Sequence, residues 1–220
     1  MAPKIRSQGL IYINGVRHEI GADFAGWMLA DYLRRERQLT GTKIVCAEGD
    51  CGACTVLRFF PGIGRKKLGR SARFLPINSC ITTMAQLDGS SLITVDALTT
   101  GKELTPVQEA MKTCHGSQCG FCTPGFVMAL TGLVEKKREE RAPGIISEKE
   151  ARNALTGNLC RCTGYQQILD AAVSIPLDSC QSVAAHYYSE KQDRELRLAL
   201  SRALKIESAA LKIQAPVSLR

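Results

Sequence analysis

Eight of the ten cysteines in this chain fall into two groups of four that have different spacings. The first group is Cys46, Cys51, Cys54 and Cys80, and the second is Cys119, Cys122, Cys160 and Cys162. Thiolates are soft ligands that suit zinc and iron–sulfur clusters. Two groups of four therefore predict two separate metal centres, and two redox centres in one small protein indicate that electrons pass through it.

The first group has the opening spacing of plant-type 2Fe-2S ferredoxins, with four residues between its first two cysteines and two before the third. Its fourth ligand is Cys80, and 25 residues lie between Cys54 and Cys80. Gly49 and Gly52 allow the loop to curl tightly around a cluster, because glycine adopts backbone angles that other residues resist. A zinc site is the alternative, but zinc sites prefer paired short knuckles.

The second group consists of two tight pairs, Cys119 with Cys122 and Cys160 with Cys162, with 37 residues between the pairs. Each pair is expected to precede a helix, where free N–H groups and the helix dipole favour an anionic thiolate cluster. The spacing alone leaves a four-cysteine zinc site open. The ferredoxin-type loop on the same chain favours a second iron–sulfur cluster.

The remaining candidates for chemistry carry no prediction of catalysis. Cys114 is expected to be a small buried hydrophobic residue, and Cys180 a free thiol. The three histidines are scattered, and Glu48 and Asp50 in the first cysteine loop are expected to make local hydrogen bonds or domain contacts. No catalytic triad, phosphate-binding glycine loop or paired carboxylate site can be recognised.

The elements around the first group predict a small mixed domain. Two runs of alternating apolar residues flank Asn14 and Gly15, which tolerate positive φ, so a β-hairpin is expected over residues 10–20. Apolar residues at helical spacing predict one main helix over residues 24–37. Further strands are expected at residues 55–60, 74–77 and 92–95, with an exposed basic loop at 61–73 before the second of them.

The elements around the second group predict about four short helices. Thr105 and Thr123 each stand before a proline, which is typical of an N-cap followed by a first-turn proline. Ser147 and Glu150 could form a capping box. A fourth helix is expected after Tyr165. The sequence therefore predicts domains at 1–96 and 97–175, followed by a tail or linker at 176–220 with one amphipathic stretch at 193–204.

Composition excludes several classes of function. The net charge is +8 and the pI about 9.0, but the basic residues lie in short runs at 65–73 and 136–141 without interleaved aromatic residues. Solvated loops and helix ends explain these runs better than nucleic-acid binding. No apolar run reaches the roughly 18 residues of a membrane span, and no signal peptide is recognisable. A cytoplasmic protein is expected, in which clustered cysteines stay reduced and bind metals.

Four segments of this sequence resemble the iron–sulfur portion of the molybdenum hydroxylases. Within that family, their amino-acid sequences are most similar to those of xanthine dehydrogenases of the bacterial type. The segments are CAEGDCGACTV (46–56), PINSC (76–80), HGSQCGFCTPGFVMAL (115–130) and GNLCRCTGYQQILDA (157–171). The resemblance implies an α+β chain with a ferredoxin-like β-grasp domain followed by a four-helix bundle. Each of these two domains would bind a 2Fe-2S cluster.

The resemblance also implies a route for electrons. The second group of cysteines would hold the cluster near the molybdopterin, the first group would hold the cluster near FAD, and FAD would reduce NAD or another acceptor. Gln118 would contact the pterin. Molybdopterin and FAD would belong to partner chains or domains, namely a molybdopterin-binding large subunit and an FAD-binding domain or subunit, with a dimer of the assembled complex. No substrate-oxidising site is expected in this chain.

Two features depart from the family pattern. The basic stretch 61–73 lengthens the gap before Cys80, and Ile44 and Val45 stand where a more polar pair is expected. An apolar pair at this position could exclude water from the cluster and alter its potential. The last residues, IQAPVSLR, resemble the entrance to the FAD domain of the family, so Arg220 is expected to mark the end of a fragment.

The expected function is the electron-transfer component of an enzyme that oxidises xanthine or hypoxanthine. The iron–sulfur component of an aldehyde oxidase, or of an aromatic-CoA or N-heterocycle hydroxylase, is an alternative within the family. A stand-alone ferredoxin or a zinc-binding module is the alternative from a different class.

Overall fold

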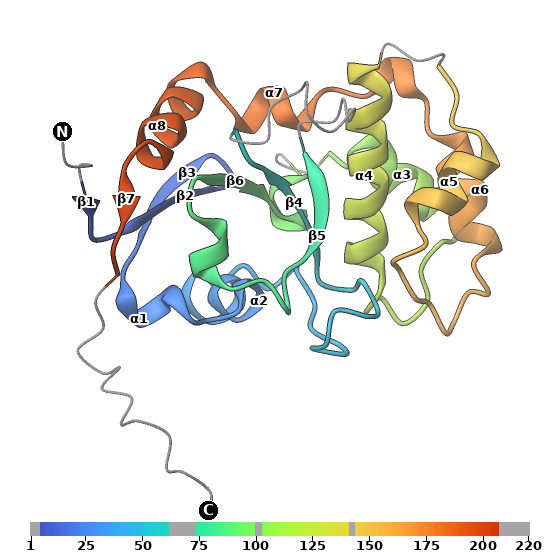
Figure 1. The fold of residues 1–220 in the computed structure, drawn as a ribbon. Coiled ribbons are helices and arrows are strands. Elements are labelled where there is room, and N and C mark those ends of the chain that lie inside the picture. The colour runs from blue at the N-terminus through green and yellow to red at the C-terminus, as the bar shows by residue number, and fades with distance from the viewer. Residues whose placement is uncertain (1–4, 62–73, 100–102, 141–143, 207–220) are drawn as a thin grey trace, which may run out of the picture.

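The structure is a computed structural model that describes residues 5–61, 74–99, 103–140 and 144–206. A sheet domain is followed by a helical domain, and the two lie side by side (Figure 1). The expected α+β class is therefore confirmed.

The sheet domain is built on five strands of mixed direction. In spatial order the strands are β3, β2, β6, β4 and β5, with β2 and β6 parallel and the other neighbours antiparallel. Their bounds are β2 (Gly9–Ile13), β3 (Val16–Ile20), β4 (Thr55–Phe59), β5 (Leu75–Asn78) and β6 (Ser90–Ile93). Two short 3₁₀ helices, η2 (Met84–Leu87) and η3 (Val95–Ala97), lie before and after β6, and a third, η4 (Leu177–Ser179), follows residue 175.

The predicted hairpin is confirmed. Asn14 and Gly15 form the turn between β2 and β3, with φ of 51° and 78°. Ile11 and Ile13 of β2 belong to the same buried cluster as Leu29 and Leu33 of the helical segment that covers the sheet. Alternate residues of a strand point to opposite faces, so β2 is left with a second apolar face.

The prediction of one continuous helix over 24–37 is wrong. The segment contains α1 (Ala22–Ala25), α2 (Leu29–Asp31) and a π-helical turn (Tyr32–Glu36). Met28 is extended, with φ of −71° and ψ of 142°, and pairs with Thr83 in an isolated β-bridge. This tertiary contact interrupts the helical hydrogen bonds that the local pattern predicted.

The helical domain contains the four predicted helices. They are α3 (Pro106–Thr113), α4 (Thr123–Glu139), α5 (Glu148–Ala154) and α6 (Gln166–Ser174). Thr105 caps α3, and Ser147 and Glu150 form the predicted capping box of α5. Thr123 is not an N-cap, because the helix begins one residue earlier than predicted and Cys122 holds that position.

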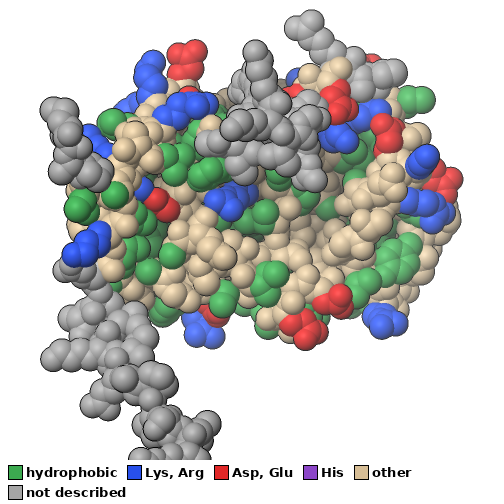
Figure 2. Space-filling view, viewed as in Figure 1, with side chains coloured by type: hydrophobic (Ala, Val, Ile, Leu, Met, Phe, Trp, Pro, Cys, Tyr) green, Lys and Arg blue, Asp and Glu red, His purple; other side chains and the backbone are tan. Residues whose placement is uncertain are grey.

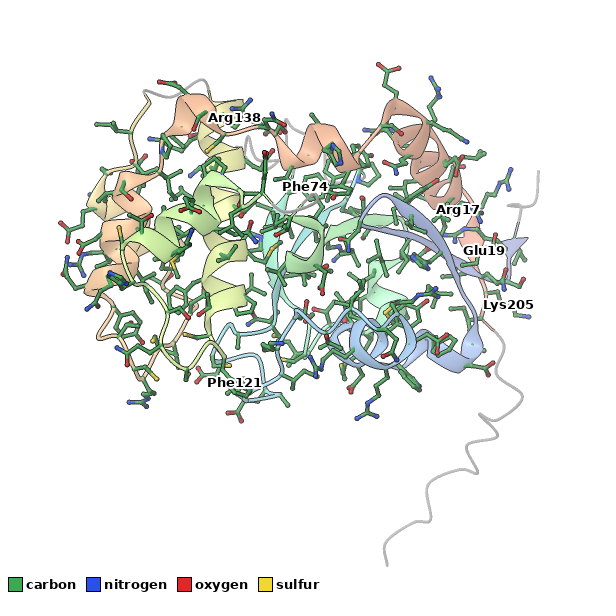
Figure 3. The ribbon with its side chains drawn as sticks, turned by 180° about the vertical axis from the view of Figure 1, so that it is seen from behind. Arg17, Glu19, Phe74, Phe121, Arg138 and Lys205 are labelled. Atoms are coloured by element: carbon green, nitrogen blue, oxygen red, sulfur yellow. The ribbon has the colours of Figure 1, made fainter. Side chains whose placement is uncertain are left out.

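The two domains share one hydrophobic core. Leu57, Phe74 and Ile93 of the sheet domain pack in the same buried cluster as Phe126 and Leu130 of α4. Figure 3 shows Phe74 between the sheet and the helical domain. Such a continuous core holds the two domains in one orientation, because separating them would expose apolar surface to water.

Residues 176–206 fold back onto the sheet domain. They form α7 (Val183–Tyr187), α8 (Glu190–Leu200) and β7 (Ala203–Leu204), and β7 pairs in parallel with β1 (Ile5–Arg6). Leu196 and Ala199 of α8 cover Leu10 and Tyr12, the second apolar face of β2. The expected amphipathic stretch is thus an ordered helix that covers the sheet.

Two expectations fall outside the described residues. These are the basic loop, of which residues 62–73 are not described, and the final segment that ends at Arg220. Among the described residues no helix is long and apolar enough to cross a membrane. On the face drawn in Figure 2, the described Lys and Arg side chains are mixed with Asp and Glu, as expected for a solvated surface.

Candidate metal centres

The first four cysteines lie at one end of the strand pair β4–β5. Cys54 immediately precedes β4 and Cys80 follows β5, and the antiparallel register, with Thr55 opposite Asn78, places these two strand ends side by side. Cys46 and Cys51 belong to the loop that leads into β4. The sheet therefore determines where Cys54 and Cys80 lie, and the loop must bring the other two thiols to them.

The loop is curled by three residues with positive φ. Ala47 has φ of 60°, Gly49 of 83° and Gly52 of 68°. The side-chain amide of Asn78 donates a hydrogen bond of 2.5 Å to the Gly49 carbonyl oxygen, which ties the loop to the end of β5. The expected role of the two glycines agrees with this backbone, because both positions require left-handed angles.

Backbone N–H groups inside this loop point at sulfur. The N–H of Cys51 lies 3.4 Å from the Sγ of Cys46. Hydrogen bonds from the N–H groups of Cys51 and Glu48 lower the pKa of the Cys46 thiol to about 6. The loop thus stabilises negative charge on sulfur, which is the charge state in which cysteine binds a metal.

The four thiols are arranged as two hydrogen-bonded pairs. Cys46 pairs with Cys51, and Cys54 pairs with Cys80. Burial and the neighbouring Cys54 thiol raise the pKa of Cys80 to about 12 in the metal-free chain. A bound cation reverses this preference, because a coordinating thiol is deprotonated by the metal.

The second four cysteines meet where two helices begin. Cys122 is the N-cap of α4, and Cys160 and Cys162 lie in the turn before α6. These thiols also form two pairs, Cys122 with Cys160 and Cys119 with Cys162. Burial, together with the Cys160 thiol, raises the pKa of Cys122 to about 12 in the metal-free chain.

Cys160 has its own set of polar partners. The Thr163 hydroxyl lies 3.2 Å from the Cys160 Sγ, and the Thr163 N–H donates to the same sulfur at 3.4 Å. The Cys160 N–H donates to the hydroxyl of Tyr165 at 2.9 Å. Although burial acts in the opposite direction, the hydrogen bonds from Thr163 and from the Cys162 backbone lower the pKa of Cys160.

Exposure differs across the second group. Cys160 is buried, whereas Cys119 and Cys162 are exposed, as is Gln118 beside them. Phe121, which lies between Cys119 and Cys122 in the sequence, is 59% exposed. Figure 3 shows Phe121 at the edge of the molecule. One side of this group therefore faces inward and the other faces solvent.

The pairing of the thiols fits a two-iron cluster. A single zinc ion takes four thiolates around one point. A 2Fe-2S cluster takes four thiolates as two pairs, one pair for each iron, and the cysteines of both groups are paired in this way. Among the described residues, no three His, Cys, Asp or Glu side chains are arranged around one position for a single metal ion.

The two groups lie in direct backbone contact. The N–H of Leu159, next to Cys160, donates a hydrogen bond of 2.9 Å to the carbonyl oxygen of Cys51. The amide of Asn158 donates to the carbonyl oxygen of Gly52 at 3.0 Å. Two centres held by these cysteines would thus be neighbours, which the linear spacing of the sequence does not reveal.

Four supporting residues are absent from the sequence-based prediction. They are Asn78, Asn158, Thr163 and Tyr165, each within five residues of a cysteine ligand candidate. Their polar side chains beside the cysteines were the available signal.

Two cysteines lie outside the two groups of four. Cys180 is buried, and Cys114 is half-buried with its Sγ 3.8 Å from the Ser174 hydroxyl. Both pack in or against the shared core.

Comparison with known proteins identifies similar sequences. Residues 94–173 match a family described as a 2Fe-2S binding domain. The chain is 42% identical over 175 residues to the nicotine 6-hydroxylase small subunit of Paenarthrobacter nicotinovorans, which covers 80% of this chain and 93% of that subunit. It is 41% identical over 166 residues to xanthine dehydrogenase 1 of Arabidopsis thaliana, which covers 75% of this chain. The chain spans only 12% of the length of that dehydrogenase.

A solved structure has the same fold along most of the chain. The crystal structure of quinoline 2-oxidoreductase from Pseudomonas putida 86 contains a chain that superposes with a TM-score of 0.61 at 33% identity. The match covers 83% of this chain and 97% of that one. The fold, the cysteine groups and the similarity therefore extend together over the two domains.

Proposed function

This chain belongs to the iron–sulfur components of the molybdenum hydroxylases, and we propose that it carries electrons between the molybdopterin of a partner and a flavin. The observation that carries the proposal is the pair of four-cysteine groups, joined by the 2.9 Å hydrogen bond between Leu159 and Cys51. A 2Fe-2S cluster, when bound, accepts and releases one electron at a time.

In this proposal each cysteine group holds one cluster. Cys46, Cys51, Cys54 and Cys80 are the ligands in the sheet domain, and Cys119, Cys122, Cys160 and Cys162 are the ligands in the helical domain. We propose that each hydrogen-bonded pair of thiols would supply the two thiolates of one iron. Burial of Cys54, Cys80 and Cys160 excludes water from part of both sites. This exclusion of water and the hydrogen bonds to sulfur together set the reduction potentials of the clusters.

Electrons enter at the helical domain and leave from the sheet domain. The exposed Cys119 and Cys162 are available to a partner, and the role that we propose for the exposed Gln118 beside them is contact with a pterin through its amide. Cys160 faces inward and lies next to the contact with Cys51. The partners in this proposal are a molybdopterin-binding large subunit and an FAD-binding domain or subunit, in a dimer of the assembled complex. NAD or another acceptor would be reduced indirectly.

The division at 1–96 and 97–175 remains our proposal for the two cluster domains, with 176–220 leading toward an FAD domain or chain. The match to the 2Fe-2S binding domain at residues 94–173 supports the boundary between them. The hairpin-containing sheet and the four helices lie on the corresponding sides of this boundary.

The substrate that we propose for the complex is xanthine or hypoxanthine. The likeness to xanthine dehydrogenase supports it, and a bacterial type of that enzyme is the specific proposal. An N-heterocycle such as nicotine or quinoline is the second candidate, since the likeness to the nicotine 6-hydroxylase small subunit is of the same strength and covers 93% of that subunit. Aldehydes are a third candidate, because rat aldehyde oxidase 1 is 42% identical.

The test is metal analysis and EPR spectroscopy of the reduced complex as purified, followed by assays with xanthine, nicotine, quinoline and aldehydes. Two distinguishable 2Fe-2S signals and turnover of xanthine are the expected results. Zinc in either site, or a single cluster, would contradict the electron-transfer function. Turnover of nicotine, quinoline or an aldehyde without xanthine would contradict the substrate alone.

Two variants of ligand candidates test the proposed order of electron transfer. Cys51→Ser and Cys162→Ser each remove one ligand and should block reduction of the final acceptor in half-reaction stopped-flow experiments. Reduction of the molybdenum site by substrate should persist in both. Loss of that first step with normal cluster content would contradict the proposed order.

A further inference from the structure

We propose that Asn158 is a positioning residue for electron transfer between the two clusters, an inference that rests on the proposed function. Its side-chain amide holds the two cysteine loops so that the Leu159 N–H stays on the Cys51 carbonyl. Leu159 precedes the ligand candidate Cys160, and Cys51 is itself a ligand candidate. One hydrogen bond therefore connects the ligand set of one cluster to that of the other.

Asn158 is buried between the domains. Its side chain is 5% exposed, and its Nδ2 donates at 3.0 Å to the Gly52 carbonyl oxygen. The same oxygen accepts from the Thr55 hydroxyl at 2.7 Å and from the Thr55 N–H at 3.1 Å. The Asn158 N–H donates to the Leu155 carbonyl at 3.0 Å. The residue is thus fixed at both ends, by its own domain and by the opposite loop.

Two glycines allow this close approach. A Cβ at Gly52 would lie 2.2 Å from the Gly157 carbonyl oxygen and 2.6 Å from the Asn158 amide nitrogen. A Cβ at Gly125 would lie 2.1 Å from the Gly52 carbonyl oxygen. At Gly52 and Gly125 there is therefore no room for a side chain. The Asn158 amide adds a second directional hydrogen bond to the one between Leu159 and Cys51.

Cys51 and Cys160 are the ligand candidates next to this contact. The irons that these two cysteines would hold would be linked through the hydrogen bond from the Leu159 N–H to the Cys51 carbonyl oxygen. The transfer moves one electron from a reduced cluster to an oxidised one, and no covalent bond forms or breaks. Since tunnelling weakens steeply with separation, a small opening at Asn158 should slow the transfer.

The experiment compares two variants of Asn158 in the complex as purified. Asn158→Ala removes the amide, and Asn158→Asp keeps its size but turns the donor into an acceptor facing the Gly52 carbonyl. Asn153→Ala is the matched control, because Asn153 is exposed on the same domain. Ile168→Val is a second control that perturbs a buried side chain of α6 away from the contact.

Low-temperature EPR of the reduced protein measures the magnetic splitting that each cluster causes in the signal of the other. Both Asn158 variants should reduce this splitting and slow electron equilibration between the clusters several-fold. Iron content and the g-values of each cluster should stay those of the wild type. Neither control should change the splitting.

An unchanged splitting and rate in both Asn158 variants would overturn the proposal and leave the proposed function intact. Loss of a cluster in both variants, with both clusters retained in Ile168→Val, would overturn it too, since Asn158 would then serve cluster binding. Absence of two 2Fe-2S signals from the wild type would instead refute the proposed function.

Discussion

The hydroxyl of Thr163 lies 3.2 Å from the Sγ of Cys160, and the Thr163 N–H donates to the same sulfur. In the proposed cluster Cys160 would be a thiolate and could not donate, so the Thr163 hydroxyl would be the donor. Cys160 is also the cysteine whose neighbour contacts the other loop. A side chain three residues away therefore stabilises negative charge on Cys160, one of the two ligand candidates beside the proposed electron route.

Thr163→Val should make the reduction potential of the helical-domain cluster more negative. A hydrogen bond to sulfur stabilises the more negative, reduced state, and a net worth of ~1 kcal/mol corresponds to roughly 40 mV for one electron. Redox titration followed by EPR measures the shift. Thr163→Ser keeps the hydroxyl and should keep the potential, and an equal shift in both variants would contradict the assignment.

Leu196→Ala should destabilise the protein by about 2–5 kcal/mol, the usual cost of deleting a buried leucine side chain. Leu196 is fully buried against Leu10 and Tyr12, so α8 is a structural part of the sheet domain. Urea unfolding measures the change. Leu198→Ala, in the same helix but 53% exposed, should have a small effect. Equal effects would show that α8 does not cover the sheet in solution.

Gly125→Ala should destabilise the protein, although alanine is more favourable than glycine in a helix by up to ~1 kcal/mol. The new Cβ would lie 2.1 Å from the Gly52 carbonyl oxygen, and overpacking of this kind costs about 1–3 kcal/mol because backbone cannot rotate away. Gly132→Ala in the same helix meets the flexible end of Leu57 at 3.0 Å and should be nearly neutral. Thermal unfolding of both variants separates the two outcomes.

Glu150 should stabilise the helical domain in a pH-dependent way. Hydrogen bonds from Lys137 and then Ser147 lower the pKa of Glu150 from 4.5 to about 2. Because the pKa is lower in the folded state, the stabilisation is fully present above pH 4.5 and is lost as the pH falls toward 2. Lys137 is buried but the Glu150 side chain is 40% exposed, so solvent screens the ion pair in part and the effect is modest.

Glu150→Gln tests this dependence. The difference in urea midpoint between wild type and variant should be constant above pH 4.5 and shrink as the pH falls below it. Glu148→Gln is the control, because Glu148 lies in the same helix and its ion pair with Arg152 is exposed on both sides. A difference for Glu150→Gln that grows on acidification would contradict the linkage.

The sequence by itself determined the features that depend on local chemistry. The turn at Asn14 and Gly15, the capping box of Ser147 and Glu150, and the order of sheet and helical domains follow from nearby residues, and all are present in the structure. Cysteine spacing likewise defined two groups of ligand candidates, because a loop around a cluster needs thiols at fixed intervals along the chain.

Tertiary structure decided the features that depend on residues far apart in the chain. The helix expected over 24–37 is interrupted because Met28 pairs with Thr83, a contact that local periodicity cannot encode. Residues 183–204 pack onto the sheet because β2 has a second apolar face for α8 to cover. Above all, Leu159 meets Cys51 because Gly52 and Gly125 let the backbone segments touch, and a distance between two centres belongs to the fold rather than to the spacing of cysteines.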